Sequence, residues 1–373
     1  MHIVYFFTFG YSLDSWNSSG IIDREIKIFE KLVQKYNYKF TLVTYGGIED
    51  KRYSIGKNIK VVPIYTLISK SENNFINIYK SFFLSRKLKK ELGSFDLIKQ
   101  NQLMGSWVSI LLKISSRKTL YTRTGYDMFL FSIKERKSVL KKMLYYLLTQ
   151  FTLLFSNLYS VTSNSDFEFV RKSFIVGRSK LILRPNWVVS IGNDKFNERY
   201  VNRILTVGRL HAQKNYSDLI KSLEGSSLIL DVVGDGEELL KLKSLAERLN
   251  VNVNFLGIVK NSDLLEMYPK YKFFVSTSLF EGNPKAILEA MSAGCIVIAR
   301  DISNNSELIT TNINGILYDD KKVVLKNLLK NLDEKAGHKN ISNNAVNYIK
   351  DNNSIEKLLR NLQEDFDKLT TAN

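Results

Sequence analysis

Two glutamates flank a Gly-Asn-Pro turn in the stretch from Ser276 to Gly294. Glu281 directly precedes the turn, and Glu289 is eight residues further along. The apolar run before the stretch predicts a buried strand and Pro284 suits the first turn of a helix, so Glu281 should lie on a loop and Glu289 on the following helix, facing one crevice. A helix N-terminus favours a diphosphate and carboxylates accept hydrogen bonds from sugar hydroxyls, so the pattern indicates a nucleotide-sugar site. In the competing interpretation, Glu281 caps the helix and Glu289 is solvated.

Two cations follow an earlier apolar run. Arg209 and Lys214 lie in the loop from Gly208 to Asn215, before a predicted helix. A guanidinium fork and an ammonium suit a diphosphate leaving group, whose oxygens gain charge as the bond to the sugar breaks. The alternative is that both side chains are solvated.

Glycines mark the ends of two further predicted strands. Gly234 and Gly236 follow LILDVV, and Gly257 follows VNVNFL. Glycine lets a ligand or another backbone approach closely, although after a strand it also serves simple turns.

Short apolar runs alternate with helical patterns along most of the chain, which predicts parallel sheets covered by helices. We expect an α/β protein with two Rossmann-like, doubly wound domains facing a central cleft, because 373 residues exceed what one core usually organises. Predicted helices of the first half include residues 74–90, 104–115 and 136–156. The predicted divisions are an N-terminal domain over 1–186, a linker over 187–200, a C-terminal domain over 201–352, and a final helical segment over 353–373 that packs back toward the N-terminal domain.

The positive charge is concentrated in the first half. Residues 1–186 hold 30 Lys and Arg against 13 Asp and Glu, whereas residues 187–373 hold 24 against 24. Such a field attracts polyanions, including anionic membranes, lipid-linked diphosphates and nucleic acids. We expect a cytoplasmic protein, because no apolar stretch is long enough to span a bilayer and the N-terminus lacks the features of a signal peptide. The single Cys295 and three scattered histidines argue against a zinc site, and Cys295 is expected to be a buried, inert thiol.

The motifs of the second half together resemble the donor domain of retaining glycosyltransferases of family 4, which have the GT-B architecture. They read GRL-H-x-x-KN, VVGDG, NFLG, STSLFEGNPKAILEAMSAGCIVIA and NGILY. The resemblance implies that Arg209 and Lys214 bind the donor phosphates and stabilise the departing diphosphate, that Glu281 contacts the donor sugar, and that Glu289 holds the ribose hydroxyls. It further implies donor-binding positions at Gly208, Gly234, Gly236, Ile258, Gly282, Asn283, Pro284, Lys285 and Ala286.

The first half resembles the family more loosely. Residues 9–20 form a predicted small-residue loop before a helix, in the place of the family's glycine-rich loop, and Ser19 and Gly20 are the candidates for approaching the donor phosphates. Capping of the helix by Ser18 or Ser19 is the alternative. Many family members have a histidine near the reacting carbon, where this chain reads YTRTGYD at 121–127. Arg123 and Asp127 are its polar substitutes for sugar or acceptor contacts, and Asp127 as a general base would suit an inverting enzyme.

The resemblance implies a hexosyltransferase that moves a sugar from a nucleotide diphosphate-sugar to a hydroxyl with retention, without a metal or other cofactor. The basic first half suggests an acceptor on an anionic membrane, such as a lipid-linked saccharide of surface polysaccharide assembly, with the enzyme peripheral on the inner face of the cytoplasmic membrane. The segment 143–155 suits an interfacial helix, or else a core helix.

Two other functions remain open. A nucleotide-sugar 2-epimerase uses the same fold but needs further acid, base and histidine residues in the cleft. A nucleic-acid-binding module would explain the basic half but not Glu281, Glu289 and the glycines.

Overall fold

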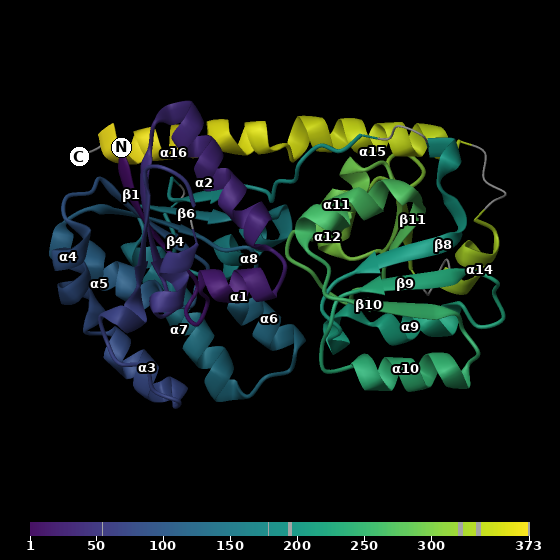
Figure 1. Cartoon of the computed structure of the whole chain (residues 1–373), viewed down its shortest axis with the longest axis horizontal. Helices are drawn as coiled ribbons and strands as arrows, with labels where there is room; N and C mark the ends of the chain where they lie inside the picture. Colours follow the sequence, from purple (N-terminus) through teal and green to yellow (C-terminus); the bar gives the residue numbers. More distant parts are fainter. Residues whose placement is uncertain (54, 178, 193–195, 320–323, 333–336, 372–373) are drawn as a thin grey trace. The chain divides into compact units, whose positions relative to one another are not determined.

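The computed structural model describes residues 1–53, 55–177, 179–192, 196–319, 324–332 and 337–371. It divides into two compact units (Figure 1). Unit 1 contains Met1–Arg184 and Leu359–Asn373, and unit 2 contains Pro185–Leu358. The predicted linker over 187–200 includes residues 193–195, which lie outside the described residues. The assignment of one domain to the acceptor and one to the donor stays a prediction.

Unit 1 is built on a parallel sheet of seven strands in the order β3-β2-β1-β4-β5-β6-β7. Its strands are β1 (His2–Phe6), β2 (Lys39–Thr44), β3 (Ile59–Pro63), β4 (Leu97–Asn101), β5 (Thr119–Arg123), β6 (Leu158–Val161) and β7 (Leu181–Leu183). Its helices are α1 (Leu13–Ser18), α2 (Ile22–Tyr36), α3 (Asn74–Ser81), α4 (Leu84–Leu92), α5 (Ser106–Ser116), α6 (Met128–Lys134), α7 (Val139–Phe155) and α8 (Asn164–Ser173). The register is set by β1, in which Ile3 pairs with Phe40 of β2 on one side and Leu97 of β4 on the other.

Unit 2 is built on a parallel sheet of six strands in the order β10-β9-β8-β11-β12-β13. Its strands are β8 (Tyr200–Val207), β9 (Ile229–Val233), β10 (Val253–Gly257), β11 (Tyr271–Ser276), β12 (Ile296–Arg300) and β13 (Ile316–Tyr318). Its helices are α9 (Tyr216–Ser222), α10 (Leu239–Arg248), α11 (Asn261–Met267), α12 (Lys285–Ser292), α13 (Ser303–Ser306), α14 (Leu325–Lys330) and α15 (His338–Asn352).

Both faces of the unit 2 sheet are buried, which explains its nearly continuous apolar strands. In β11, Phe273 and Val275 pack on one side, in the core that α9, α10 and α14 share. Phe274 packs on the other side with residues of α12 and α15. Cys295 is fully buried in that second layer, as predicted, and burial raises the pKa of its thiol to about 12.

The final helix is α16 (Ile355–Thr371). Its first residues belong to unit 2, and its residues from Leu359 onward belong to unit 1. Within unit 1, its Asp365 accepts hydrogen bonds from both Arg184 and the Tyr121 hydroxyl, at 2.6 and 3.0 Å. The predicted fold class, two parallel α/β domains of the Rossmann type, is confirmed. Among the described residues, none of the helices combines the length and apolar character that crossing a bilayer requires.

Three details of the predicted first half are wrong. The predicted helix over 74–90 is two helices, α3 and α4, because the chain turns at residues 82–83 and buries Leu84 and Leu88. The predicted helix over 136–156 begins only at Val139, after Arg136 adopts a left-handed φ of 53°, and α6 precedes it. The predicted loop over 9–20 contains α1, because Ser12 and Ser15 form a capping box at its start.

Candidate functional site

The predicted donor residues of unit 2 gather at one edge of its sheet. Because all six strands are parallel, the loops that follow them leave from the same edge. β8 is the first strand and has β9 on one side and β11 on the other, so the chain reverses its direction of winding between β8 and β11. Crevices at such reversal points are where doubly wound sheets bind ligands. The loop after β8 carries Lys214 and the loop after β11 carries Glu281, one on each side of this point.

Lys214 and Glu281 form an ion pair. The Lys214 ammonium donates a hydrogen bond to Oε1 of Glu281 at 2.5 Å. Their side chains are 21% and 10% exposed, so the pair is shielded but still reachable. The helix after Glu281 has Pro284 as its N-cap and no side-chain cap bond, so the interpretation of Glu281 as a cap is wrong. Pro284 thus lies just before the helix, not in its first turn as predicted. An ammonium and a carboxylate joined in this way offer a ligand both N–H donors and oxygen acceptors at the same place.

Hydrogen bonds fix the two loops to each other. The Gln213 side chain donates from Nε2 to the Phe280 carbonyl at 2.7 Å, and the backbone carbonyl of Gln213 accepts from the Leu279 backbone amide at 2.9 Å. The Thr277 hydroxyl donates to the Lys214 carbonyl at 2.9 Å. These contacts hold the backbone on both sides of the ion pair, so the pair is positioned in advance of any ligand. Sequence analysis did not predict Gln213 and Thr277 as site residues, because their hydrogen bonds join two loops that are far apart in the sequence.

Glu289 lies on α12, as predicted, but it is buried rather than solvated. It is 2% exposed. Its Oε1 accepts from the Asn261 amide and its Oε2 from the Tyr268 hydroxyl, both at 3.1 Å. The interpretation of Glu289 as a surface residue is wrong. Asn261 and Tyr268 orient the carboxylate, and its contact with ribose hydroxyls stays a prediction.

The Gly-Asn-Pro turn is held from inside unit 2 by asparagines. The Asn186 amide N–H donates to Oδ1 of Asn283 at 2.9 Å, and its Nδ2 donates to the Asn283 carbonyl at 2.5 Å. Asn353 in turn donates from Nδ2 to the Asn186 carbonyl at 2.7 Å. All three residues are buried. The Asn283 carbonyl, predicted to line the donor pocket, is thus engaged by Asn186. Asn186 is the last residue of the predicted N-terminal domain, directly before the predicted linker, so nothing in its pattern indicated this contact.

Replacing Asn186 with alanine should loosen this turn. The Asn283 carbonyl would lose a buried partner, which costs about 1–3 kcal/mol. We expect the Kd for a nucleoside diphosphate to rise about tenfold, since about 1.4 kcal/mol corresponds to that factor. Asn254→Ala is the matched control, because Asn254 Nδ2 bonds Asp231 at 2.8 Å in the same unit, away from the turn. Equal titration curves for the two variants would show that Asn186 does not position the turn.

The predicted glycines pack against one another. A Cβ on Gly234 would lie 2.0 Å from the Gly208 carbonyl oxygen, and one on Gly236 would lie 2.4 Å from that of Leu210. Gly208 donates to the Val233 carbonyl at 2.9 Å, and Gly234 donates to that of Gly257 at 2.8 Å. The structure thus gives Gly234 and Gly236 a packing reason, namely the close approach of neighbouring loops, whatever their role toward a ligand.

Four further predicted residues lie around this edge. Arg209 and Ile258 are exposed, on the loops after β8 and β10. Within the described part of the chain, the Arg209 side chain makes no hydrogen bond or ion pair. Lys285 and Ala286 begin α12, and the Lys285 ammonium lies 5.7 Å from the centre of the buried Trp187 ring. Arg209 is therefore available to an anionic ligand but is not held beside Lys214.

The candidates from the first half lie in unit 1 and are described within that unit. Ser19 is the C-terminal cap of α1, and its hydroxyl donates to the Ser15 carbonyl at 2.7 Å. Gly20 follows with a φ of 70°. Capping of the next helix by Ser18 or Ser19 is wrong, because Ile21 precedes α2 and makes no side-chain cap bond. The two residues lie beyond α1 rather than on the loop directly after β1.

Arg123 and Asp127 lie at the end of β5 and just after it. Asp127 is the N-cap of α6, and its Oδ1 accepts from the Leu130 amide at 2.7 Å. It is 2% exposed, and its other oxygen, Oδ2, is buried without a hydrogen-bond partner among the described residues. Burial raises the pKa of Asp127 to about 6, against the lowering effect of the helix amides. The group has a clear structural role in capping, and a role as general base stays a prediction.

This raised pKa makes stability depend on pH. Because the folded state favours the neutral acid, the contribution of Asp127 is present below about pH 4 and is lost as the pH rises through about 6. Asp127→Asn keeps the capping oxygen and removes the charge. We expect the free energy of unfolding of Asp127→Asn to equal that of the wild type near pH 4. Above pH 7 it should be larger than that of the wild type by up to about 3 kcal/mol. Urea unfolding at both pH values measures this, and a difference independent of pH would contradict it.

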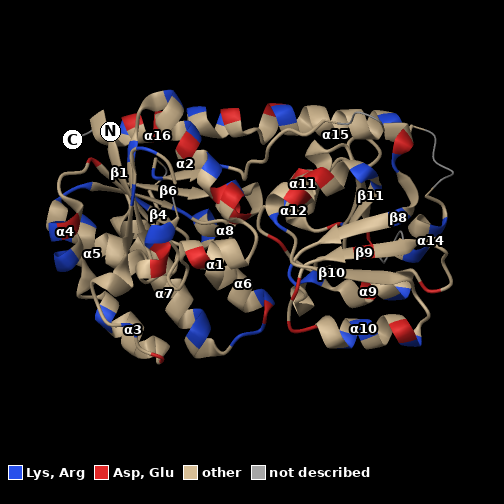
Figure 2. Cartoon of the chain, viewed as in Figure 1, with Lys and Arg blue, Asp and Glu red and all other residues tan. Residues whose placement is uncertain are grey.

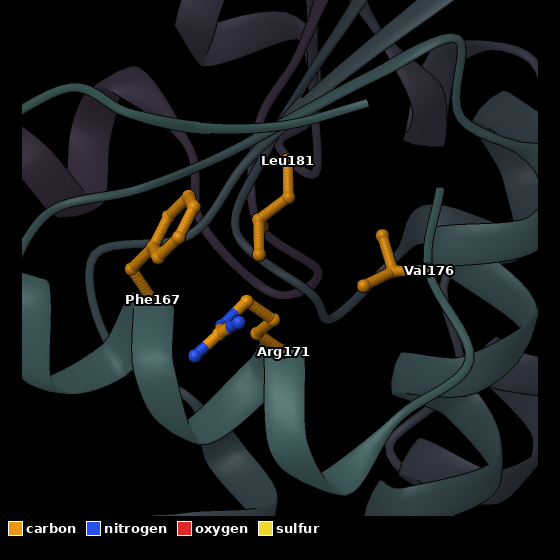
Figure 3. Close-up of a pocket in the computed structure, with 4 residues that line it drawn as sticks. All are labelled: Phe167, Arg171, Val176 and Leu181. Atoms are coloured by element: carbon orange, nitrogen blue, oxygen red, sulfur yellow. The ribbon is translucent and has the colours of Figure 1, made fainter. Parts of the chain in front are cut away.

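A hollow of about 410 Å³ in unit 1 lies elsewhere (Figure 3). Phe167 and Arg171 of α8, with Val176 and Leu181, line it. The side chains are mainly apolar, and the Arg171 guanidinium bonds Glu168 at 2.7 Å. None of the predicted site residues lines this hollow, and its chemistry does not suggest a sugar or phosphate site.

Comparisons with known proteins concern the family and the fold of the chain. Residues 193–348 match the family model described as glycosyl transferases group 1. An uncharacterized glycosyltransferase of Methanocaldococcus jannaschii is 26% identical, over 92% of this chain and 90% of that protein. A UDP-Gal:alpha-D-GlcNAc-diphosphoundecaprenol alpha-1,3-galactosyltransferase of Escherichia coli is 28% identical, over 74% and 76%. The crystal structure of Anabaena HepE in complex with UDP and glucose has a TM-score of 0.74 at 16% identity, over 99% and 100%.

The two parallel sheets and these matches identify the chain as a glycosyltransferase of the GT-B fold. Its donor-type motifs and the matched region coincide over most of unit 2. The two relatives are both named as glycosyltransferases and give no support to the epimerase or the nucleic-acid-binding interpretation.

Proposed function

We propose that the enzyme transfers a hexose from a nucleoside diphosphate-sugar to a hydroxyl of a lipid-linked saccharide, with retention of the anomeric configuration. The observation that carries the donor part is the Lys214–Glu281 pair at the winding reversal of the unit 2 sheet. The name of the Escherichia coli relative, a transferase from UDP-Gal to a diphosphoundecaprenol-linked sugar, supports the choice of substrate classes. Unit 2 is the proposed donor domain and unit 1 the acceptor domain, and surface polysaccharide assembly is the proposed context.

In the proposed reaction, Lys214 and Arg209 bind the diphosphate and stabilise the negative charge that it gains as the bond to the sugar breaks. Glu281 accepts a hydrogen bond from the sugar, and Glu289 holds the ribose. The acceptor hydroxyl attacks the same face from which the diphosphate leaves, and a phosphate oxygen takes its proton. We propose that the cations replace a metal as the electrostatic partner of the diphosphate, so that turnover persists in a chelator.

The proposed enzyme is peripheral on the inner face of the cytoplasmic membrane, where the net positive charge of the chain, +17, favours an anionic leaflet. An inverting reaction with Asp127 as base is the alternative chemistry.

Two measurements test the proposal. Thermal unfolding with a panel of nucleoside diphosphates should show stabilisation by at least one of them, because a ligand of the folded state raises its stability. With the donor so found, the anomeric proton coupling of the product, measured by NMR, should match that of the donor. No stabilisation by any nucleoside diphosphate would contradict donor binding, and an inverted product would contradict the mechanism.

A further inference from the structure

Helix α7 exposes many large apolar side chains. Six of them lie at helical spacing on its exposed side. They are Leu140, Met143, Leu144, Leu147, Phe151 and Leu154. Thr149 and Thr152 are fully buried instead, and the Thr152 hydroxyl is 2.8 Å from that of Ser106 on α5. Leu153 is buried as well, and Tyr146 packs against the same core cluster. The helix therefore has a narrow core side, as the core-helix alternative predicted, and an exposed apolar side besides.

Helix α3 likewise exposes large apolar side chains and buries small polar ones. Asn77 and Ser81 are buried, and Asn77 uses its amide for two hydrogen bonds to the Ser71 backbone. Phe75 is 81% exposed and Tyr79 66%. Ile76, Phe82 and Phe83 are exposed as well. Rings as large as these are costly to leave in water, and a concentration of them marks an interaction surface.

The two helices flank the first turn of α5. Trp107 of α5 donates from Nε1 to the Ser81 hydroxyl of α3 at 2.7 Å, and its ring stacks on Phe82 at 6.0 Å. The neighbouring Ser106 makes the contact with Thr152 of α7. Helices α3 and α7 therefore pack against neighbouring residues of α5. We call the exposed apolar residues of the two helices, together with Phe82 and Phe83, the α3–α7 surface.

Basic residues adjoin this surface. Arg136, Lys137, Lys141 and Lys142 lie at or just before the start of α7, a helix with no acidic residue (Figure 2). The wider region of residues 51–150 holds 20 Lys and Arg against 5 Asp and Glu. A second copy of the chain would bring the same positive charge to the surface and be repelled. An anionic bilayer supplies both an apolar layer for the rings and negative headgroups for the lysines.

We propose that the α3–α7 surface docks unit 1 on an anionic lipid bilayer. The inference deepens the proposed function, on which it rests for the lipid-linked acceptor, because it names the side chains that enter the membrane interface. Phe75, Tyr79, Leu144, Leu147 and Phe151 insert, while Lys141 and Lys142 remain at headgroup level. The α3 part had no counterpart in the sequence analysis, which placed residues 74–90 in a single helix.

Vesicle flotation of the full chain tests the surface. Wild type should float with vesicles of phosphatidylethanolamine and phosphatidylglycerol, and much less with phosphatidylcholine alone. The triple variant Leu144→Ser, Leu147→Ser, Phe151→Ser and the double variant Phe75→Ser, Tyr79→Ser should each bind at least about tenfold more weakly, because each removes several large apolar side chains from the interface. Leu240→Ser is the matched control, since Leu240 of α10 in unit 2 is 79% exposed and should bind as wild type.

Two readouts make the outcome decisive. Thermal unfolding should be unchanged in the flotation variants, because their replaced side chains are exposed. Brominated lipid should quench part of the tryptophan fluorescence of wild type, and this quenching should be lost in Trp107→Phe. Equal flotation of wild type and both α3 and α7 variants would overturn the proposal. So would a concentration-dependent dimer, seen by sedimentation without vesicle binding and lost in the variants.

Failure of the proposed function can be distinguished from failure of the proposed membrane surface. Stabilisation of the same variants by nucleoside diphosphate depends on unit 2, and transfer to a soluble acceptor in detergent does not require the α3–α7 surface. Vesicle binding without any donor binding would refute the proposed transfer and leave the surface standing. Donor binding without vesicle binding would refute the proposed membrane surface and leave the proposed transfer standing.

Discussion

Lys214→Ala and Glu281→Ala should each lower kcat/KM for sugar transfer by about 10² to 10³, the range seen when one preorganised electrostatic group is removed from an active site. Both side chains belong to one ion pair between the loops after β8 and β11. Because residues that act as a unit are not additive, the double variant should be little worse than the poorer single variant. Steady-state kinetics on the three proteins measures this.

The control for this prediction is Arg203→Ala. Arg203 pairs with Asp231 at 2.7 Å on the same sheet, but inside β8 and β9 rather than on the loops. It should lose stability without a comparable loss of transfer. Near-normal turnover in both Lys214→Ala and Glu281→Ala would refute the assignment of the pair, and an equal loss in Arg203→Ala would show that the effect is only structural.

Gly234→Ala should strongly destabilise unit 2, although it adds only one methyl group. Its Cβ would lie 2.0 Å from the Gly208 carbonyl oxygen, which is backbone and cannot rotate away, and Gly234 has a φ of 136°. We expect a loss of about 3 kcal/mol or more in the free energy of unfolding, because backbone strain and overpacking act together. Urea unfolding followed by circular dichroism gives the value.

Gly225→Ala is the control for Gly234→Ala. Gly225 also has a positive φ, 74°, but a Cβ there meets nothing within 4 Å. It should cost only about 1–2 kcal/mol, the cost of the left-handed conformation for an alanine. A Gly234→Ala protein as stable as Gly225→Ala would mean that the loops after β8 and β9 separate easily, which would remove the packing argument for the glycine.

The sequence predicts the strands and the loops of unit 2 well, because their signals are local. Runs such as KFFVS are buried on both faces, and the glycines and charged residues after β8, β9 and β11 fall where the parallel strands end. Glu289 was placed on the correct helix from its spacing to Pro284 alone. What its spacing could not show is that Asn261 and Tyr268, more than 20 residues earlier, fold back to hold its carboxylate.

Features that depend on distant contacts could not be predicted. Asn186 reaches Asn283 across 97 residues of sequence. The apolar stripe of α7 has the spacing of a core helix, and only its packing through Thr149, Thr152 and Leu153 reveals that the stripe faces outward. The division between α3 and α4 likewise follows from burial of Leu84 and Leu88, not from a breaker residue such as glycine or proline.

The most direct test of the central claim compares two ligands on wild type and Lys214→Ala by isothermal titration. The nucleoside diphosphate selected by thermal unfolding and its parent nucleoside differ only in the phosphates. If unit 2 binds an activated sugar through Lys214, the variant should bind the diphosphate at least about tenfold more weakly and the nucleoside unchanged, since the loss is confined to a charge-assisted contact. Equal affinity of wild type and variant for the diphosphate would contradict the account.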